Sequence, residues 1–201
     1  MRAASGAIET IKVVDGELEI GTIENTKAIG ICGSGLVDAC ASLVQLGLLD
    51  NSGRFVTQEE AEKVAPKVAS RLVEREGERV FVLTWGGKEG DLNDCVFLTQ
   101  RDVRELQFAK AAIATGWALL LEEFGVAESE VQQVLLAGSF GSYLSPASAV
   151  KIGLVPKLPG YRHISRDDVR EIFNKKWGVT LRPEPGLRIP NMFDSALGEG
   201  F

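Results

Sequence analysis

Two glycine-rich segments, each placed between a short apolar run and a helix pattern, constrain this chain most. In the first, the run Lys27–Cys32 breaks into Gly33-Ser34-Gly35. In the second, the run Val131–Ala137 ends at Gly138-Ser139-Phe140-Gly141. Junctions of this kind connect the strands and helices of layered α/β folds. The sequence therefore predicts an α/β fold.

The neighbouring elements follow from turn and periodicity signals. Asp15-Gly16 between two β-rich segments, 7–14 and 17–23, predicts a hairpin. A helix is predicted after Gly35 and ends near Gly47; its apolar face carries Leu36, Cys40, Leu43 and Val44. The charged segment 57–76 favours a helix interrupted at Pro66, and 79–85 and 95–99 are predicted strands.

The strongest helix signal covers Gln100–Phe124. Thr99 is a good N-cap, Asp102 places negative charge in the first turn, and Gly125 is a suitable C-cap. Small residues in its apolar stripe predict close packing on a sheet or helix; the stripe is Val103, Leu106, Ala109, Ala112, Ile113, Gly116, Leu119 and Leu120. A short helix should start at Ser145-Pro146 and stop near Gly153.

Composition narrows the class of protein. With 201 residues, 45% hydrophobic and 25% charged, the chain is one globular domain, or one domain with an appendage. A net charge of −6 argues against non-specific attraction to nucleic acid. No apolar run is long enough to span a membrane and no signal peptide opens the chain, which predicts a cytoplasmic location.

The cysteines and the single histidine give little support for a metal centre. Cys32, Cys40 and Cys95 include no Cys-x-x-Cys pair, so neither a disulfide framework nor a zinc or iron–sulfur site is indicated. Cys40 and Cys95 are predicted core residues. Cys32, beside the glycine loop, is either structural or a reactive thiolate stabilised by helix amides. His163 is predicted to be a surface loop residue.

The first glycine segment is a candidate anion site. Gly33, Ser34 and Gly35 would present free backbone amides at a helix start, although a tight structural connection is the alternative interpretation. The segment is neither a Walker sequence nor a complete dinucleotide fingerprint. Asp38, one turn further, either holds Mg²⁺ through water or interacts with the helix dipole.

The second glycine segment is a candidate site for a flat ligand. Gly138 and Gly141 leave room for a ring, or simply let strand and helix approach closely. Phe140 and Tyr143 are predicted core residues, with a lid over a ligand as the alternative.

A third segment resembles a phosphate-binding turn, and we predict that this resemblance is a coincidence. Glu19-Ile20-Gly21-Thr22 resembles the Asp-x-Gly-Thr phosphate turn of actin-type ATPases. It forms the return arm of the predicted hairpin, however, with Glu in place of Asp.

Four ordered motifs carry a family resemblance: MRAASGAI at 1–8, GICGSGLVDA at 30–39, QRDVRELQFAKAAI at 100–113 and LAGSFGSYLSPASAVKIGLVP at 136–156. Residues 1 to about 156 resemble the C-terminal ATPase domain of the reductive activators of corrinoid proteins. That family belongs to the superfamily of actin, sugar kinases and heat-shock chaperones. The resemblance implies a partial actin-like (ribonuclease H-like) ATPase domain.

The resemblance also implies a function. Members couple ATP to low-potential electron transfer from an N-terminal [2Fe–2S] domain and return Co(II) corrinoid to Co(I). By resemblance, Gly33, Ser34 and Gly35 lie at the phosphates of ATP with its Mg²⁺, and Gly138, Ser139 and Gly141 match the adenosine-side turn. The implied partners are a corrinoid protein and, because related domains often self-associate, a second copy of the chain.

Two parts of the family pattern are missing from this sequence. One is the [2Fe–2S] domain, so this chain is not expected to bind the cluster. The other is the Asp-Ile-Gly-Thr-Asn phosphate turn, expected just upstream of Met1. With one lobe of the nucleotide cleft absent, a fragment of this kind should bind ATP weakly and hydrolyse it hardly at all, and no catalytic residue is assigned.

Beyond about Pro156 the pattern changes. A helix is predicted over 166–176, capped by Ser165 and stopped by Gly178, and a proline-rich stretch follows. Residues 158–201 are similar to an inter-domain segment of molybdopterin-dependent formate dehydrogenases, and no site transfers from it. We expect a partial ATPase domain over 1–157 and a tail over 158–201 that is not an independent domain; either a mis-joined reading frame or a divergent natural tail explains the change.

The sequence leaves three possible functions open. The leading one is the nucleotide-binding part of an ATP-dependent reductive activator. The second is a non-catalytic docking or dimerisation module that uses the helix Gln100–Phe124, and the third is an inert, truncated chimeric fragment.

Overall fold

The computed structural model describes residues 1–157 and 161–163, which all belong to one unit, Met1–His163. The side chains of Ser139, Phe140, Ser142 and 161–163 lie outside this description, as do the helix and proline-rich stretch predicted beyond residue 163. The strands are β1 (Ala7–Val14), β2 (Glu17–Thr22), β3 (Gly30–Ile31), β4 (Leu72–Arg75), β5 (Glu78–Thr84), β6 (Val96–Thr99), β7 (Val134–Leu136) and β8 (Tyr161–His163). The helices are α1 (Gly33–Gln45), α2 (Gln58–Val64), α3 (Gln100–Glu123), α4 (Gly138–Tyr143) and α5 (Pro146–Lys151), with 3₁₀ turns at Ile23–Asn25, Ala69–Arg71 and Glu128–Glu130.

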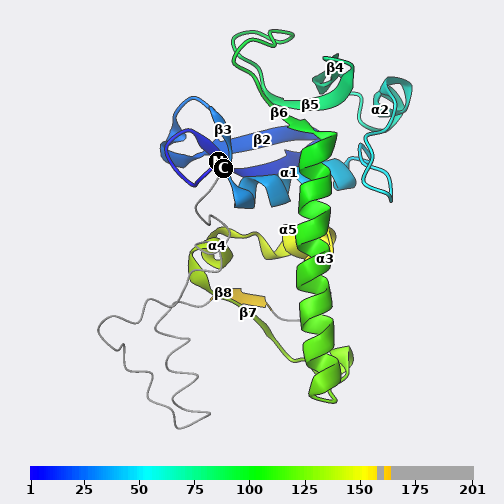
Figure 1. The fold of residues 1–201 in the computed structure, drawn as a ribbon. Helices are drawn as coiled ribbons and strands as arrows, with labels where there is room; N and C mark the ends of the chain where they lie inside the picture. Colours follow the sequence, from blue (N-terminus) through cyan, green and yellow to red (C-terminus); the bar gives the residue numbers. More distant parts are fainter. Residues whose placement is uncertain (158–160, 164–201) are drawn as a thin grey trace, which may run out of the picture. The chain divides into compact units, whose positions relative to one another are not determined.

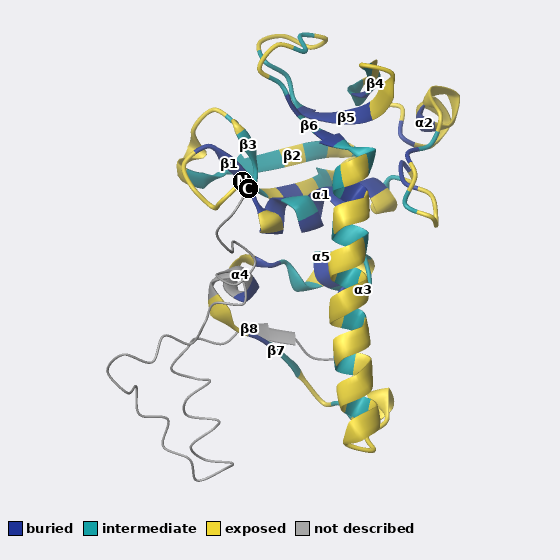
Figure 2. Ribbon diagram, viewed as in Figure 1, coloured by how far each residue is buried: buried dark blue, intermediate teal, exposed yellow. Residues whose placement is uncertain are grey.

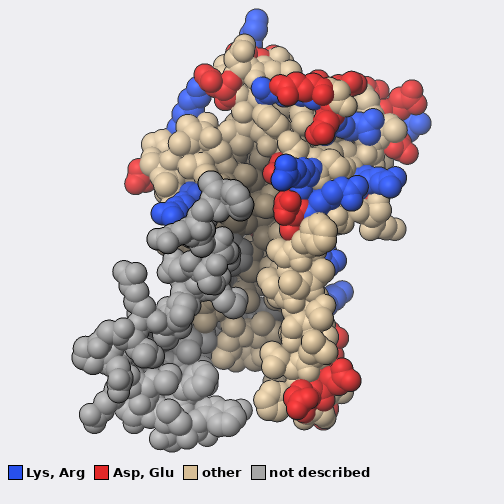
Figure 3. All heavy atoms as spheres, viewed as in Figure 1, with Lys and Arg blue, Asp and Glu red and all other residues tan. Residues whose placement is uncertain are grey.

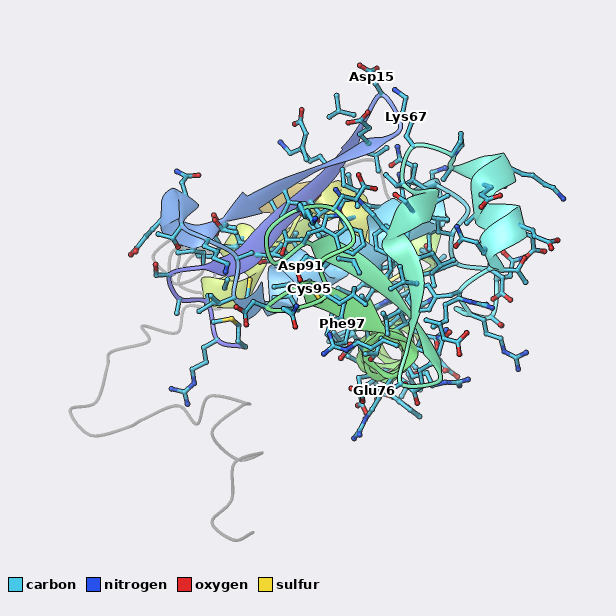
Figure 4. The ribbon with its side chains drawn as sticks, turned by 90° about the horizontal axis from the view of Figure 1, so that it is seen from above. Asp15, Lys67, Glu76, Asp91, Cys95 and Phe97 are labelled. Atoms are coloured by element: carbon cyan, nitrogen blue, oxygen red, sulfur yellow. The ribbon has the colours of Figure 1, made fainter. Side chains whose placement is uncertain are left out.

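The first sheet has the order β2-β1-β3 and is built on the predicted hairpin (Figure 1). Asp15 and Gly16 both have positive φ, 50° and 81°, as the two-residue turn requires. At the tip, Lys67 Nζ donates a hydrogen bond of 2.8 Å to the Asp15 carbonyl oxygen; Figure 4 shows the two residues side by side. Glu19–Thr22 lies in β2, so the actin-like segment is the return arm of the hairpin, as expected.

Helix α1 packs on β1 and supplies much of the core. Cys40 and Leu43 are buried, as predicted, and burial raises the pKa of the Cys40 thiol to about 12. Val44, predicted on the same face, is 43% exposed. That expectation is wrong because Val44 lies in the last turn of α1, where the chain turns away at Gly47 and leaves this side uncovered.

The second sheet is antiparallel, with the order β4-β5-β6. The expectation of helix up to residue 76 is wrong for β4, because Glu76 and Gly77 have positive φ and turn this segment back to pair with β5. In β4, Leu72 is buried whereas Glu74 is exposed. The helix before it, α2, begins with a Thr57–Glu60 capping box.

Helix α3 has the predicted ends but not the predicted burial. Thr99 and Asp102 form a capping box, and Gly125 has a φ of 63°. Of the small-residue stripe only Val103 is buried, whereas Leu119 and Leu120 are each 58% exposed. Figure 2 shows exposure along most of the helix. Val103 and Leu106 pack against the core, so the expected close packing holds for the first turns of α3. It is wrong from Ala109 to Leu120, where the residues of the stripe are exposed.

The last described elements are short. β7 is shorter than the predicted strand 131–137, and α5 is capped by the Ser145 side chain as predicted. β8 pairs with β7 in parallel, His163 opposite Leu136, so the expectation that His163 is a loop residue is wrong. The proposed division of the chain at residue 157 stays a prediction.

Candidate functional site

The start of α1 presents backbone amides that the helix itself does not use. Cys32 is the N-cap residue and its side chain makes no capping bond. The first intrahelical bond runs from the Leu36 amide to the Cys32 carbonyl, at 2.9 Å. The amides of Gly33, Ser34 and Gly35 therefore lie at the positive end of the helix dipole, which is the environment that favours an anion.

The three predicted phosphate-contacting residues differ in their surroundings. Gly33 is exposed, whereas Ser34 and Gly35 are buried. A Cβ on Gly35 would lie 2.2 Å from the Ile8 carbonyl oxygen, so this glycine is required for the close approach of α1 to β1. Gly33 and Ser34 line a pocket. Gly35 is not in the described lining of this pocket, but it allows α1 to lie close to β1.

The pocket at the start of α1 has a volume of about 480 Å³ and its described lining is Ala3, Glu9, Ile23, Cys32, Gly33, Ser34 and Tyr143. No lysine or arginine occurs among these residues. Glu9 is the single carboxylate, and sequence reasoning missed it. The signal that reveals it is the β1–β2 register, which shifts between Ile8 and Thr10 and leaves Glu9 as an extra residue.

Tyr143 connects the two glycine segments. It is the last residue of α4, which begins at the second segment and packs against α1. Tyr143 is 68% exposed, so the expectation of a core position is wrong: the residue lies at the open end of α4, where it borders the pocket of Gly33 and Ser34. It also borders a larger cleft of about 590 Å³ between β1, α1 and α5.

The predicted adenosine-side residues are not in the described lining of either cavity. A Cβ on Gly141 would lie 3.2 Å from the Leu136 carbonyl carbon, so this glycine lets α4 approach β7 closely. The side chain of Ser139 lies outside the described residues. The assignment of Gly138, Ser139 and Gly141 to a nucleotide stays a prediction.

Asp38 ties α1 to β1. Its Oδ2 accepts a hydrogen bond of 3.1 Å from the Ile11 amide, and the Ser42 hydroxyl lies 3.5 Å from the Ile11 carbonyl oxygen. Asp38 is 5% exposed and its Oδ1 is buried with no hydrogen-bond partner. Asp38 lines the larger cleft rather than the pocket of Gly33 and Ser34, and its metal-binding role stays a prediction.

Cys32 has a structural environment. It is 4% exposed, and its Sγ lies 3.3 Å from the Ile8 carbonyl oxygen and 3.2 Å from the Ser34 hydroxyl. These contacts favour the structural interpretation over that of a reactive thiolate. In the part of the chain that the structure describes, no three His, Cys, Asp or Glu side chains form a group that could hold a metal ion.

The comparison with protein families decides which family this chain belongs to. The family described as the C-terminal domain of RACo, the ASKHA domain, matches residues 1–166. The chain belongs to this family. ASKHA domains have the actin-like fold, so the predicted fold class and the family resemblance are confirmed.

Two relatives of this ASKHA domain are informative. The corrinoid activation enzyme RamQ of Eubacterium limosum is 37% identical over 161 residues, which cover 80% of this chain and 27% of RamQ. The solved structure of a reductive activator for a corrinoid, iron–sulfur protein has a TM-score of 0.67 and 31% identity, and covers 82% of this chain and 26% of that activator. The ASKHA domain thus spans about a quarter of the length of each relative. No helix in its described part is long and apolar enough to cross a membrane.

Proposed function

We propose that this ASKHA domain is the nucleotide-binding part of an ATP-dependent reductive activator of a corrinoid protein. The observation that carries the proposal is the uncapped start of α1, with Gly33 and Ser34 in a pocket of about 480 Å³. Unused helix amides beside a pocket suit the phosphates of a nucleotide. The family and both relatives support the wider role in corrinoid activation.

Within that role, the residues of this chain bind and orient the nucleotide. The amides of Gly33 and Ser34 donate hydrogen bonds to phosphate oxygens, and Gly35 keeps α1 close enough to β1 to fix their position. Mg²⁺, when bound, neutralises phosphate charge. The site suits this ion because Mg²⁺ takes oxygen ligands and usually needs only one or two protein carboxylates beside phosphates and water. The candidates are Asp38, predicted from the sequence, and Glu9 in the pocket.

The remaining steps belong to the whole activator. In the proposal, a [2Fe–2S] domain outside this chain supplies the electron that takes Co(II) corrinoid to Co(I), and nucleotide binding controls that transfer. The corrinoid protein is then the partner. A cytoplasmic location stays a prediction.

Calorimetric titration of the full chain with ATP and Mg²⁺ tests the nucleotide-binding proposal. Gly33→Asp adds a carboxylate at the exposed start of α1, which suits the helix dipole but repels phosphate. We expect Kd to rise by about tenfold or more, equivalent to about 1.4 kcal/mol. Asn51→Asp, at an exposed site outside the pocket, adds the same charge and should leave Kd unchanged. Absence of ATP binding by the wild-type chain, or an unchanged Kd in Gly33→Asp, would refute the proposal.

A second candidate function, a docking or dimerisation module, is favoured by the surface of α3. Phe108 is 74% exposed and Phe124, just after the helix, is 72% exposed. Residues 111–121 carry no charge, and Figure 3 shows an uncharged surface over the lower part of α3 with acidic side chains at its end. An exposed apolar face of this kind is typical of an interaction surface. Sedimentation at increasing protein concentration should show dimers if a second copy covers this face, and Leu120→Glu should then restore monomers.

A further inference from the structure

Glu9 owes its place in the pocket to an irregularity in β1. Ile8 and Ile11 are both buried, at 0% and 3% exposure, although residues three apart in a regular strand point to opposite faces. The register shift between Ile8 and Thr10 resolves this conflict, because one extra residue in β1 returns Ile11 to the core face. Glu9 is that extra residue, and it lines the pocket together with Gly33 and Ser34.

A carboxylate in this pocket conflicts with a nucleotide unless a cation is also bound. Phosphates held at Gly33 and Ser34 would share the pocket with the negative charge of Glu9, and the described lining contains no lysine or arginine. The helix start supplies only about half a unit of positive charge, which does not offset a triphosphate together with a carboxylate. A divalent cation bound with the nucleotide would remove this repulsion, and the Glu9 carboxylate could then help to hold it.

We propose that the Glu9 carboxylate holds the divalent cation of the bound nucleotide, directly or through water. The inference rests on the proposed nucleotide-binding function and adds its metal-binding residue. Oxygen donors are what Mg²⁺ prefers, and one carboxylate with phosphates and water is a common set for this ion in nucleotide sites. Asp38 is less suited to this pocket, because its Oδ2 accepts a hydrogen bond from the Ile11 amide and it lines a different cavity.

The test compares the Mg²⁺ dependence of ATP binding in three variants of the full chain. In the wild type, Mg²⁺ should lower the Kd for ATP by about tenfold or more. Glu9→Gln should lose this effect and should bind metal-free ATP at least as tightly as the wild type, because the repelling charge is gone. Glu19→Gln, an exposed residue on β2 with the same change of charge, is the matched control and should behave as the wild type. Asp38→Asn tests the alternative ligand.

A second readout reports the metal itself. Mn²⁺ replaces Mg²⁺, and its electron paramagnetic resonance spectrum counts the ion bound in the presence of ATP. Glu9→Gln should reduce the bound Mn²⁺ at a given concentration, whereas Glu19→Gln should not. If Glu9→Gln fails to fold, Glu9→Asp keeps the charge on a shorter side chain and should weaken the Mg²⁺ effect.

The outcomes separate this inference from the function on which it rests. Retention of the full Mg²⁺ effect in Glu9→Gln overturns the inference alone, as does loss of the effect in Asp38→Asn but not in Glu9→Gln. Absence of ATP binding by the wild-type chain, with or without Mg²⁺, overturns both. Loss of the effect in Glu9→Gln alone, with lower Mn²⁺ binding, supports the assignment.

Discussion

Replacement of Gly35 by alanine should destabilise the domain, against the usual effect of alanine in a helix. The new Cβ would lie 2.2 Å from the Ile8 carbonyl oxygen and 3.1 Å from Ile31 Cγ1. The first contact is with backbone, which cannot rotate away as a side chain can. Helix α1 must therefore move away from β1, or the strand must shift.

The magnitude follows from two opposing effects. An added methyl in a packed site costs about 1–3 kcal/mol, and a contact with backbone belongs to the upper part of that range. Alanine in place of glycine inside a helix returns up to about 1 kcal/mol. The net loss for Gly35→Ala is then about 1–2 kcal/mol in the free energy of unfolding. For a chain of this length, each 1 kcal/mol corresponds to about 2–4 °C in Tm.

Gly116 provides the matched control, because it also lies within a helix, α3. A Cβ added there would have no atom within 4 Å apart from the backbone of α3 itself. Gly116→Ala should raise the free energy of unfolding by up to about 1 kcal/mol through helix propensity alone. Urea unfolding, monitored by circular dichroism, measures the free energy of unfolding of both variants. Equal m-values would show that the variants and the wild type can be compared directly. If Gly35→Ala is as stable as the wild type, α1 does not approach Ile8 as closely as the structure places it.

Two further predictions concern titrating groups. The Ser52 side chain and the Arg54 amide donate hydrogen bonds to Asp50, which hold the pKa of its carboxyl group below the ordinary value of 3.8. The ionised carboxylate therefore stabilises the folded chain above pH 3.8, and this stabilisation is lost as the pH falls through the lower pKa of the folded state. Asp50→Asn should therefore be less stable than the wild type at neutral pH, and the difference should shrink as the pH falls below 3.8. Urea unfolding at a series of pH values measures this, and a constant difference would contradict it. Burial raises the pKa of Cys40 to about 12 and Cys32 is buried, so at about pH 8 only the half-buried Cys95 should react quickly with a thiol reagent. Cys95→Ser should remove this fast reaction, and fast modification of a second thiol in the folded chain would contradict it.

Local signals predict those elements whose ends are determined by neighbouring residues. Asp15-Gly16 specifies the hairpin, and Thr99, Asp102 and Gly125 specify the ends of α3, because each acts through its own backbone conformation or hydrogen bonds. β4 could not be predicted from its own composition, because its pairing with β5 makes it a strand. The small-residue stripe of α3 shows the same limit, since a stripe gives no sign of what covers it.

The candidate site divides in the same way. Glycines before a helix are recognisable in sequence, and they lead directly to Gly33 and Ser34. Asp38 is a natural candidate because it lies one turn beyond them, but its position under β1 gives it the Ile11 amide as a partner. Glu9 cannot be found this way, because its place in the pocket depends on a one-residue shift between β1 and β2, and a register shift of this kind has no local sequence signature.

Gly35 and Glu9 are mechanically linked through Ile8, and this link gives a last prediction. The Ile8 carbonyl oxygen accepts a hydrogen bond of 3.1 Å from the Cys32 amide, and it is also the atom that a Cβ on Gly35 would strike. Glu9 is the next residue along β1. Displacement of α1 by Gly35→Ala should therefore change the position of the Gly33 and Ser34 amides relative to the Glu9 carboxylate. We expect Gly35→Ala to lose much of the Mg²⁺ effect on ATP binding at temperatures where it remains folded, whereas Gly116→Ala keeps it. An unchanged Mg²⁺ effect in folded Gly35→Ala would show that the cation does not depend on the spacing between α1 and β1.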